Sequence, residues 1–422
     1  MSITHEQYRQ ALANELMPAM GCTEPIALAY AAAVAGERLG GYPETIIAEV
    51  SRNIVKNVKS VIVPNTGGLY GIEAAVVAGF VSRRPQAKLE VLAAVTAQER
   101  QEIGQRVKES VIKITQTQEP DVFFIKVTGT LAEHTVSVTI RTSHTNITEI
   151  VENGQVVFEK ACASEAKQTD TEAWTIQEVI AAARVMPFEE ARFYLERQLK
   201  CNLAIAQEGL SGKWGANIGQ LLMARDPENT QVKARAWAAA GSDARMNGCE
   251  MPVVIVSGSG NQGITASVPV AIFAQDMGVD EQTTLRALLL SDLITIALKQ
   301  GIGKLSAYCG AVSAGCGSAA AIAYLKGFDD EHIQKTITNA LAISSGLLCD
   351  GAKASCAAKI AMSVEGALMA VDMVEKDRAF RNGDGIVQES ADATAAAVGR
   401  IASLGMVDTD RQIIREMLHE ER

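Results

Sequence analysis

The sequence predicts an α+β protein with a large, mainly helical C-terminal domain and a smaller α+β domain in its N-terminal part. Runs of alternating polar and apolar residues, typical of strands, fall between residues 42 and 160, whereas nearly every stretch after residue 173 has the 3.6-residue period of a helix. Hydrophobic residues make up 48% of the 422-residue chain but aromatic ones only 5%, so its helices would pack through small aliphatic side chains. We therefore expect N-terminal helices at 1–41, an α+β domain at 42–165 and a helical domain at 166–422, on which the N-terminal helices pack.

The N-terminal part is expected to begin with two helices. Residues 5–17 are amphipathic, and a second helix follows at about 25–39 with Pro25 in its first turn. Beyond them, strands are predicted at 46–51, 60–64, 122–130 and 134–142, helices near 70–83 and 97–115, and a hairpin over 147–160 that turns at Asn153-Gly154. The small, polar residues 161–172 form the expected link to the helical domain.

The C-terminal domain alternates between helices and glycine-rich loops. Helices are predicted at 175–185, 188–207, 230–246, 282–299, 317–326, 331–343, 355–376 and 388–402. Glycine-rich stretches at 209–219, 256–263 and 299–318 interrupt them. Such loops cost backbone entropy, which indicates places where the backbone must come close to something.

Charge and hydropathy exclude several classes of partner. The formal net charge is −10 with no basic stripe, which argues against nucleic acid and anionic membranes. No segment is apolar enough over its length to span a bilayer, and the N-terminus lacks the pattern of a signal peptide. We therefore expect a cytoplasmic protein, and by base rate a homodimer. In a reducing compartment its eight cysteines favour metal binding or catalysis over disulfides.

Five of the cysteines lie where loops are predicted to meet helices. Cys22, Cys316 and Cys356 stand at predicted helix starts, where unpaired N–H groups favour the thiolate. Cys309 and Cys349 lie in glycine-containing loops. Their spacing fits neither a structural zinc site nor a ferredoxin motif, and widely spaced single ligands instead suit a cluster held between loops. The other three, Cys162, Cys201 and Cys249, are expected to be small packed hydrophobes.

Four segments carry a family resemblance. MGCTEPIALAYAAAVAG, VSGSGNQGITASVPVA, SAYCGAVSAGCGSAAAIAYL and GLLCDGAKASCAAKIAMSVEGALMA resemble the L-cysteine desulfidase family, and more remotely the bacterial iron–sulfur L-serine dehydratases. The resemblance implies a 4Fe–4S cluster with one open iron, and conversion of L-cysteine, a small amino acid, to pyruvate, ammonia and sulfide.

The two families imply different ligand sets. Similarity to the desulfidases singles out Cys22, Cys309 and Cys349 as cluster or active-site cysteines, whereas similarity to the serine dehydratases makes Cys309, Cys349 and Cys356 the ligands. We favour the second set as the metal ligands. Cys22 then lies near the open iron as acid/base or as a fourth ligand at rest, and Cys316 is the reserve ligand.

The glycine-rich loop at 257–263 is the candidate substrate site. Its backbone N–H groups and polar side chains would hold the substrate carboxylate, which makes the expected binding residues Ser257, Ser259, Gly260, Asn261, Gln262 and Gly263. Lys304 and Lys353 are further carboxylate anchors to consider. The letters also match a dinucleotide-binding motif, but the proline in ITASVPVA argues against the helix that must follow.

Acid–base chemistry is assigned to Cys22, provided that its helix start lowers the thiol pKa. All five histidines fall on polar stretches and are expected to be exposed. Three other functions stay open: an iron–sulfur L-serine dehydratase, a pyridoxal-phosphate lyase and a non-enzymatic metabolite-binding protein.

Overall fold

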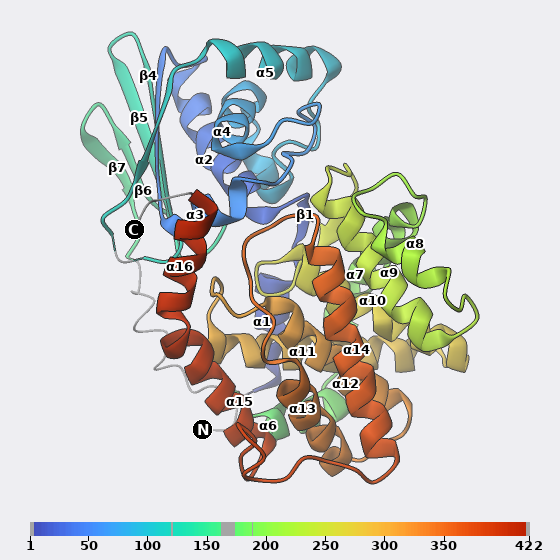
Figure 1. Cartoon of the computed structure of the whole chain (residues 1–422). Coiled ribbons are helices and arrows are strands. Elements are labelled where there is room, and N and C mark those ends of the chain that lie inside the picture. Colours follow the sequence, from blue (N-terminus) through green and yellow to red (C-terminus); the bar gives the residue numbers. More distant parts are fainter. Residues whose placement is uncertain (1–3, 120, 162–173, 188, 419–422) are drawn as a thin grey trace.

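The computed structural model describes residues 4–119, 121–161, 174–187 and 189–418, and confirms the α+β class. Figure 1 shows a smaller part, made of a sheet and helices, seated on a larger helical part. The small part comes from the first 160 residues and the large part from residues beyond 173, together with the first helix.

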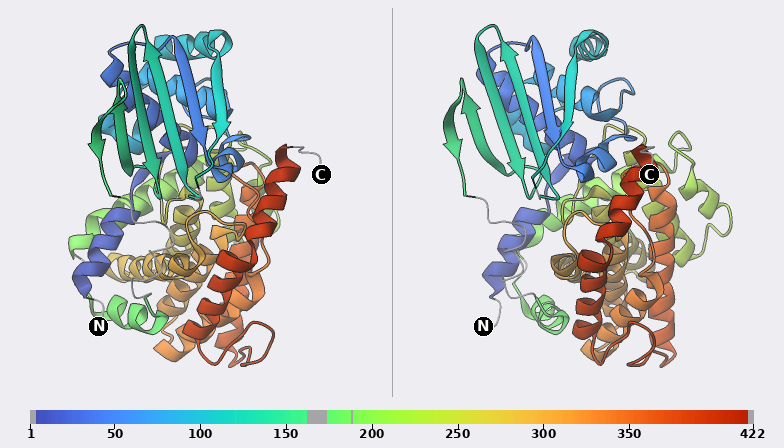
Figure 2. Two further views of the ribbon diagram at one scale, coloured as in Figure 1. Left: turned by 90° about the vertical axis from the view of Figure 1, so that its left-hand side faces the viewer. Right: turned by 60° about the vertical axis from the view of Figure 1, so that its left-hand side comes forward.

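The small part is built on a six-stranded sheet of order β3-β2-β4-β5-β6-β7. Its strands are β2 (Thr45–Val50), β3 (Ile112–Gln116), β4 (Phe124–Leu131), β5 (His134–Arg141), β6 (Ile147–Glu152) and β7 (Gln155–Glu159). β2 and β3 pair in parallel, and the other neighbours pair antiparallel. One face of the sheet is open in Figure 2, and helices cover the other.

Those covering helices approach one another closely. They are α2 (Thr23–Leu39) and α4 (Gly71–Ser82), accompanied by α3 (Arg52–Val58), η1 (Pro85–Glu90) and α5 (Ala97–Glu109). A Cβ at Gly79 of α4 would lie 2.2 Å from the carbonyl oxygen of Ala29 in α2, so only glycine allows this contact. α2 thus packs chiefly on α4 and the sheet, which differs from our expectation that the helices of 1–41 pack on the helical domain. α1 (His5–Glu15) does contact that domain, and the domain limits themselves stay predictions.

Eleven helices are described in the large part. They are α6 (Ile176–Val185), α7 (Glu189–Gly209), α8 (Ile218–Met223), α9 (Thr230–Met246), α10 (Gly260–Met277), α11 (Glu281–Ile302), α12 (Gly310–Leu325), α13 (Asp330–Ser344), α14 (Cys356–Glu375), α15 (Ala391–Arg400) and α16 (Val407–Leu418); the π-helical turn η3 (Ile401–Gly405) follows α15. Small residues let α11 and α12 pack tightly, since a Cβ at Gly317 would lie 2.4 Å from the Ser291 carbonyl oxygen. α16 runs back toward the small part and reaches α3 (Figure 1).

A short two-stranded sheet joins the two parts. β1 (Pro18–Met20) pairs antiparallel with β8 (Pro252–Val254), with Ala19 opposite Val253. α2 starts shortly after β1 and α10 shortly after β8, and the Thr23 hydroxyl donates to the Gly258 carbonyl at 2.9 Å, so the N-termini of these two helices lie together. The candidate site lies at this junction.

Several expected elements differ. Residues 60–64 form only an isolated bridge from Ile62 to Tyr70, and the helix expected at 97–115 ends at Glu109 before β3. The helix that Pro269 argued against exists: α10 continues through this proline, because burial of the helix outweighs a cost of about 3 kcal/mol. α3, α8 and α16 were not predicted. Residues 162–172 of the expected link lie outside the described residues.

No described helix combines the length and hydropathy needed to cross a membrane.

Candidate functional site

A cavity of about 100 Å³ lies where α2, α10, α12 and α14 begin. Its lining includes Cys22, Cys309, Cys349 and Cys356, together with Ser259, Asn261 and Gln262. These residues span 334 positions of sequence (Cys22 to Cys356), and the fold brings them to one place. Ser257, Gly260 and Gly263 do not line the cavity.

The loops that carry Cys309 and Cys349 are joined to each other. The Cys309 N–H donates to the Leu347 carbonyl at 3.0 Å, and the Cys349 N–H donates to the Ala307 carbonyl at 2.7 Å. This antiparallel bridge, between Tyr308 and Leu348, holds the two loops side by side. Burial, and next the charge of Cys349, raise the pKa of the Cys309 thiol to about 12.

Cys356 enters the cavity from the first residue of α14. Burial raises the pKa of its thiol, although nearby Lys353 works in the opposite direction. The Cys309 and Cys356 charges also act on each other. Three sulfurs from three different segments therefore face one space.

Lysine ammonium groups compensate the charge that these thiolates would carry. Burial lowers the pKa of Lys299 to about 8 against the attraction of Cys349 and Cys309. Burial would also lower the pKa of Lys359, but its ion pair with Asp350 and the charges of Cys309 and Cys356 raise it. Neither lysine was singled out from the sequence.

The donor chemistry fits an iron–sulfur cluster. Cysteine thiolates are the ligands that such clusters take, and second-shell cations stabilise them. Among the residues that the structure describes, no group of three His, Cys, Asp or Glu side chains is arranged to hold a single metal ion. Cys309, Cys349 and Cys356 all line the cavity, and each thiolate would bind one iron of such a cluster.

Cys22 occupies the N-cap position of α2, beside an acidic residue. Its Sγ donates a hydrogen bond to Glu24 Oε2 at 3.2 Å, and the Thr23 hydroxyl donates to the Gly258 carbonyl at 2.9 Å. Burial, followed by the charge of Glu24, raises the pKa of the Cys22 thiol well above its ordinary value. The expectation that the helix start lowers this pKa is wrong, because desolvation and the carboxylate outweigh the helix dipole.

His144 is buried at the same place, between β5 and β6. Its Nε2 lies 3.9 Å from Glu24 Oε1, and a Cβ at Gly258 would lie 2.9 Å from its Cε1 atom. Burial alone would raise the pKa of Glu24, but His144, with the hydrogen bond from Cys22, lowers it to about 2. The prediction that all histidines are exposed is therefore wrong for His144. Nothing local in its polar segment signals the contact, which depends on packing against α2.

The first turn of α10 contains two buried amide oxygens that can accept hydrogen bonds from a ligand. Asn261 Oδ1 and Gln262 Oε1 are buried and have no hydrogen-bond partner among the described residues. Gly310 lies directly against the Gln262 amide, where a Cβ would come within 2.7 Å. A ligand with hydrogen-bond donors would satisfy both oxygens, since buried polar atoms are rarely left without partners.

The other members of the expected binding loop have structural surroundings. A Cβ at Gly263 would lie 2.0 Å from the Val254 carbonyl oxygen, so this glycine lets α10 rest on β8. A Cβ at Gly260 would lie 2.4 Å from Arg245 Nε. Ser257 is buried with φ of 48°, in the turn before the helix. Their direct role in binding stays a prediction.

Arg245, which the sequence did not single out, is a buried cation of the cavity wall. It comes from α9, its Nε donates to the Gly21 carbonyl at 3.0 Å, and it lies over Gly260 at the start of α10. The one signal in the sequence was an arginine near the end of an alanine-rich helix. A guanidinium held in this way is suited to a carboxylate.

Two further candidates, Cys316 and Lys353, do not line the cavity. Cys316 falls within α12 rather than before it, and is 1% exposed among apolar neighbours. Lys353 pairs with Asp350 and does not line the cavity, whereas Lys304 does line it and lies 3.5 Å from Glu15. The reserve role of Cys316 is thus unsupported by its position.

Comparisons with known proteins agree on a family. The model of the serine dehydratase alpha chain matches residues 86–415. A UPF0597 protein of Desulfitobacterium hafniense (strain Y51) is 45% identical over 99% of this chain and 97% of its own. The UPF0597 protein YhaM of Escherichia coli (strain 55989) is 38% identical over 99% of this chain and 98% of its own.

Proposed function

Because the chain belongs to the serine dehydratase alpha chain family, we propose that it is a carbon–sulfur lyase that eliminates sulfide from L-cysteine. The family supports an iron–sulfur enzyme of the lyase type. The observation that carries the proposal further is that one cavity gathers four cysteines and side chains suited to binding an amino acid. A cytoplasmic location and a homodimer belong to the same proposal.

The proposed cofactor is a 4Fe–4S cluster held by Cys309, Cys349 and Cys356. When bound, it would supply an iron without a protein thiolate, a Lewis acid for the β-substituent of the substrate. The soft thiol of cysteine suits such an iron better than a hydroxyl does. Lys299 and Lys359 would offset the negative charge of the thiolates.

The cavity wall offers complementary groups to both ends of an amino acid. Arg245 would bind the substrate carboxylate, with the first turn of α10 beside it. The free oxygens of Asn261 and Gln262 would accept hydrogen bonds from the ammonium group. This proposal differs from our expectation that Asn261 and Gln262 hold the substrate carboxylate, because their free oxygens are acceptors and suit the ammonium end instead.

Cys22 is the proposed acid–base group. Its thiol lies in the cavity, and its hydrogen bond to Glu24 Oε2 orients the proton. His144 steadies the Glu24 carboxylate from the opposite side. The released enamine would hydrolyse to pyruvate and ammonia.

L-serine is the second candidate substrate, favoured by the name of the matching family. The test compares sulfide release from L-cysteine with pyruvate formation from L-serine, using anaerobically purified protein. We expect the larger kcat/KM with cysteine; a larger value with serine would make the protein a dehydratase. The family match supports both over the pyridoxal-phosphate and non-enzymatic alternatives.

A further inference from the structure

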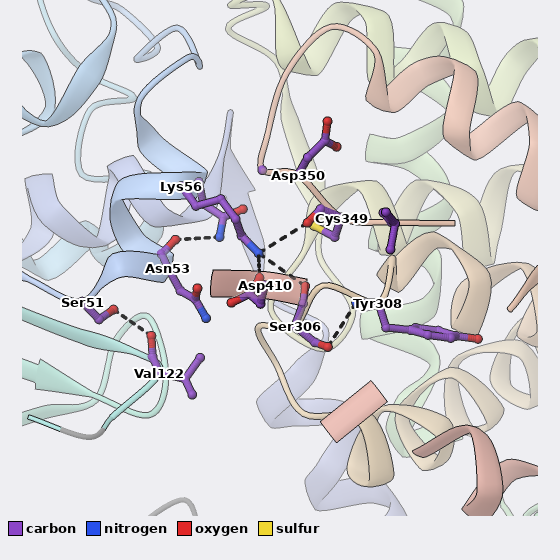
Figure 3. Close-up of polar contacts among 12 residues, drawn as sticks. Ser51, Asn53, Lys56, Val122, Ser306, Tyr308, Cys349, Asp350 and Asp410 are labelled. Atoms are coloured by element: carbon purple, nitrogen blue, oxygen red, sulfur yellow. Dashed lines mark hydrogen bonds and ion pairs between the residues drawn. The ribbon is translucent and has the colours of Figure 1, made fainter. Parts of the chain in front are cut away.

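A buried lysine of the small part contacts both cysteine loops. Lys56 lies on α3, and its side chain is 0% exposed. Its Nζ donates to the carbonyl oxygens of Ser306 at 3.5 Å and Cys349 at 3.4 Å, and lies 2.5 Å from Asp410 Oδ1 on α16 (Figure 3). One ammonium group therefore joins four segments that are far apart in sequence.

The backbone of the same residue supports the loop that carries Cys349. A Cβ at Gly351, where φ is +91°, would lie 2.2 Å from the Lys56 carbonyl oxygen. The loop after Cys349 thus rests directly on α3, independently of the Lys56 side chain. Both its position and its conformation require glycine.

The loop that carries Cys309 also contacts the C-terminal segment. The Ser306 hydroxyl donates to the Ala402 carbonyl at 3.1 Å, and the Tyr308 N–H donates to the Ser306 hydroxyl at 3.1 Å. Lys59, one turn after Lys56, donates to the Met417 carbonyl of α16. α3 therefore contacts both loops, and α16 holds α3 in place through Asp410 and the Met417 carbonyl.

We propose that Lys56 is a positioning residue that fixes the spacing of Cys309 and Cys349. Its charge attracts two carbonyl oxygens at once, one from each loop, and Asp410 holds it in place from α16. A buried ammonium without these partners would carry a large desolvation cost, so the loops and the ion pair stabilise one another. The inference rests on the proposed function, in which these two cysteines bind the cluster.

The test uses full-length protein without its cluster. In Lys56→Met, iodoacetamide alkylation of Cys309 and Cys349, followed by mass spectrometry, should be at least about fivefold faster than in the wild type, because the loops open more often. Cys201, a half-buried thiol of α7 that does not line the cavity, provides the reference rate within each sample. After anaerobic reconstitution, the variant should also show a changed electron paramagnetic resonance spectrum of the reduced cluster, which a general loss of stability would not produce.

Arg184→Met is the matched control. Arg184 pairs with Asp330 at 2.5 Å and donates to the Phe328 carbonyl at 2.9 Å, and none of these three residues lines the cavity. It should leave the alkylation rates of Cys309 and Cys349 unchanged. If Lys56→Met does not fold, Asp410→Asn should give the same changes to a smaller degree.

Equal rates and equal spectra in the wild type and in the folded Lys56 or Asp410 variant would overturn the proposal. The alkylation rates need no cluster, so they separate this inference from the proposed function. A wild type that takes up no iron would refute the function, while the rates would still decide the role of Lys56.

Discussion

The Cys22 thiol donates a hydrogen bond to Glu24 Oε2 across 3.2 Å, within the buried start of α2. A helix N-terminus favours a negative charge by about 0.3–1 kcal/mol, which is less than one pKa unit. Burial and the adjacent carboxylate act in the opposite direction, and the pKa of Cys22 rises. The local position in a helix therefore does not decide the state of this thiol.

Replacing Glu24 with Gln should lower the pKa of Cys22. The substitution removes a negative charge next to the thiol, so the thiolate would appear at lower pH. The alkylation rate of Cys22 as a function of pH, in protein without a cluster, measures this shift, and Glu250→Gln at an exposed position is the control. An unchanged or higher midpoint of the alkylation–pH curve would contradict the conclusion that the Glu24 carboxylate raises the pKa of Cys22.

The Cys22→Ser variant should separate catalysis from cluster binding. A general acid–base group typically contributes a factor of about 100 or more, so kcat should fall at least that far. The iron content should stay at the wild-type value, since the proposed ligands are elsewhere. Loss of iron together with activity would make Cys22 a ligand.

Arg245→Lys should raise KM more than it lowers kcat. Lysine keeps the charge but cannot form two parallel hydrogen bonds with a carboxylate, which should cost about 2 kcal/mol of binding, or roughly a 30-fold increase in KM. Initial rates over a range of L-cysteine concentrations measure both constants. A KM equal to that of the wild type would remove Arg245 from the substrate site.

Asp292→Asn should change how stability depends on pH. Burial raises the pKa of Asp292 to about 8, against the effect of its hydrogen bond from Gln198. Between about pH 4, near the pKa in the unfolded chain, and about pH 8, the folded protein holds one proton more than the unfolded chain. The free energy of unfolding therefore falls by at most about 1.4 kcal/mol for each unit of increase in pH. The Asp292→Asn variant does not lose stability in this way. Its free energy of unfolding, relative to that of the wild type, should therefore increase by on the order of 2 kcal/mol from about pH 5 to about pH 7.5.

Urea unfolding at these two pH values checks the prediction. Asp372→Asn, which keeps a hydrogen-bond partner for Gln231, is the control at a less buried carboxylate. A difference between Asp292→Asn and the wild type that does not change with pH would contradict it.

Local patterns predicted much of the fold. The β6–β7 hairpin turns at Asn153-Gly154 as expected, because this dipeptide favours the required backbone conformation. The β1–β8 pairing could not be predicted, since its strands are three residues each and more than 230 positions apart. It is this pairing that brings the starts of α2 and α10 together.

The site was predictable only where a chemical pattern stood out. Cysteines near helix starts and a glycine-rich turn pointed to residues that now line one cavity. Lys56, His144 and Arg245 gave no such signal, because each is a single polar residue whose partners come from distant segments. Their roles follow from long-range packing, which periodicity and spacing do not encode.

Iron and acid-labile sulfide per chain, measured on anaerobically purified protein, test the central claim most directly. We predict about four of each in the wild type and in Cys316→Ala, and almost none in Cys349→Ala. Wild-type protein that contains no iron yet releases sulfide from L-cysteine, or a Cys349→Ala variant with full iron content, would contradict the account.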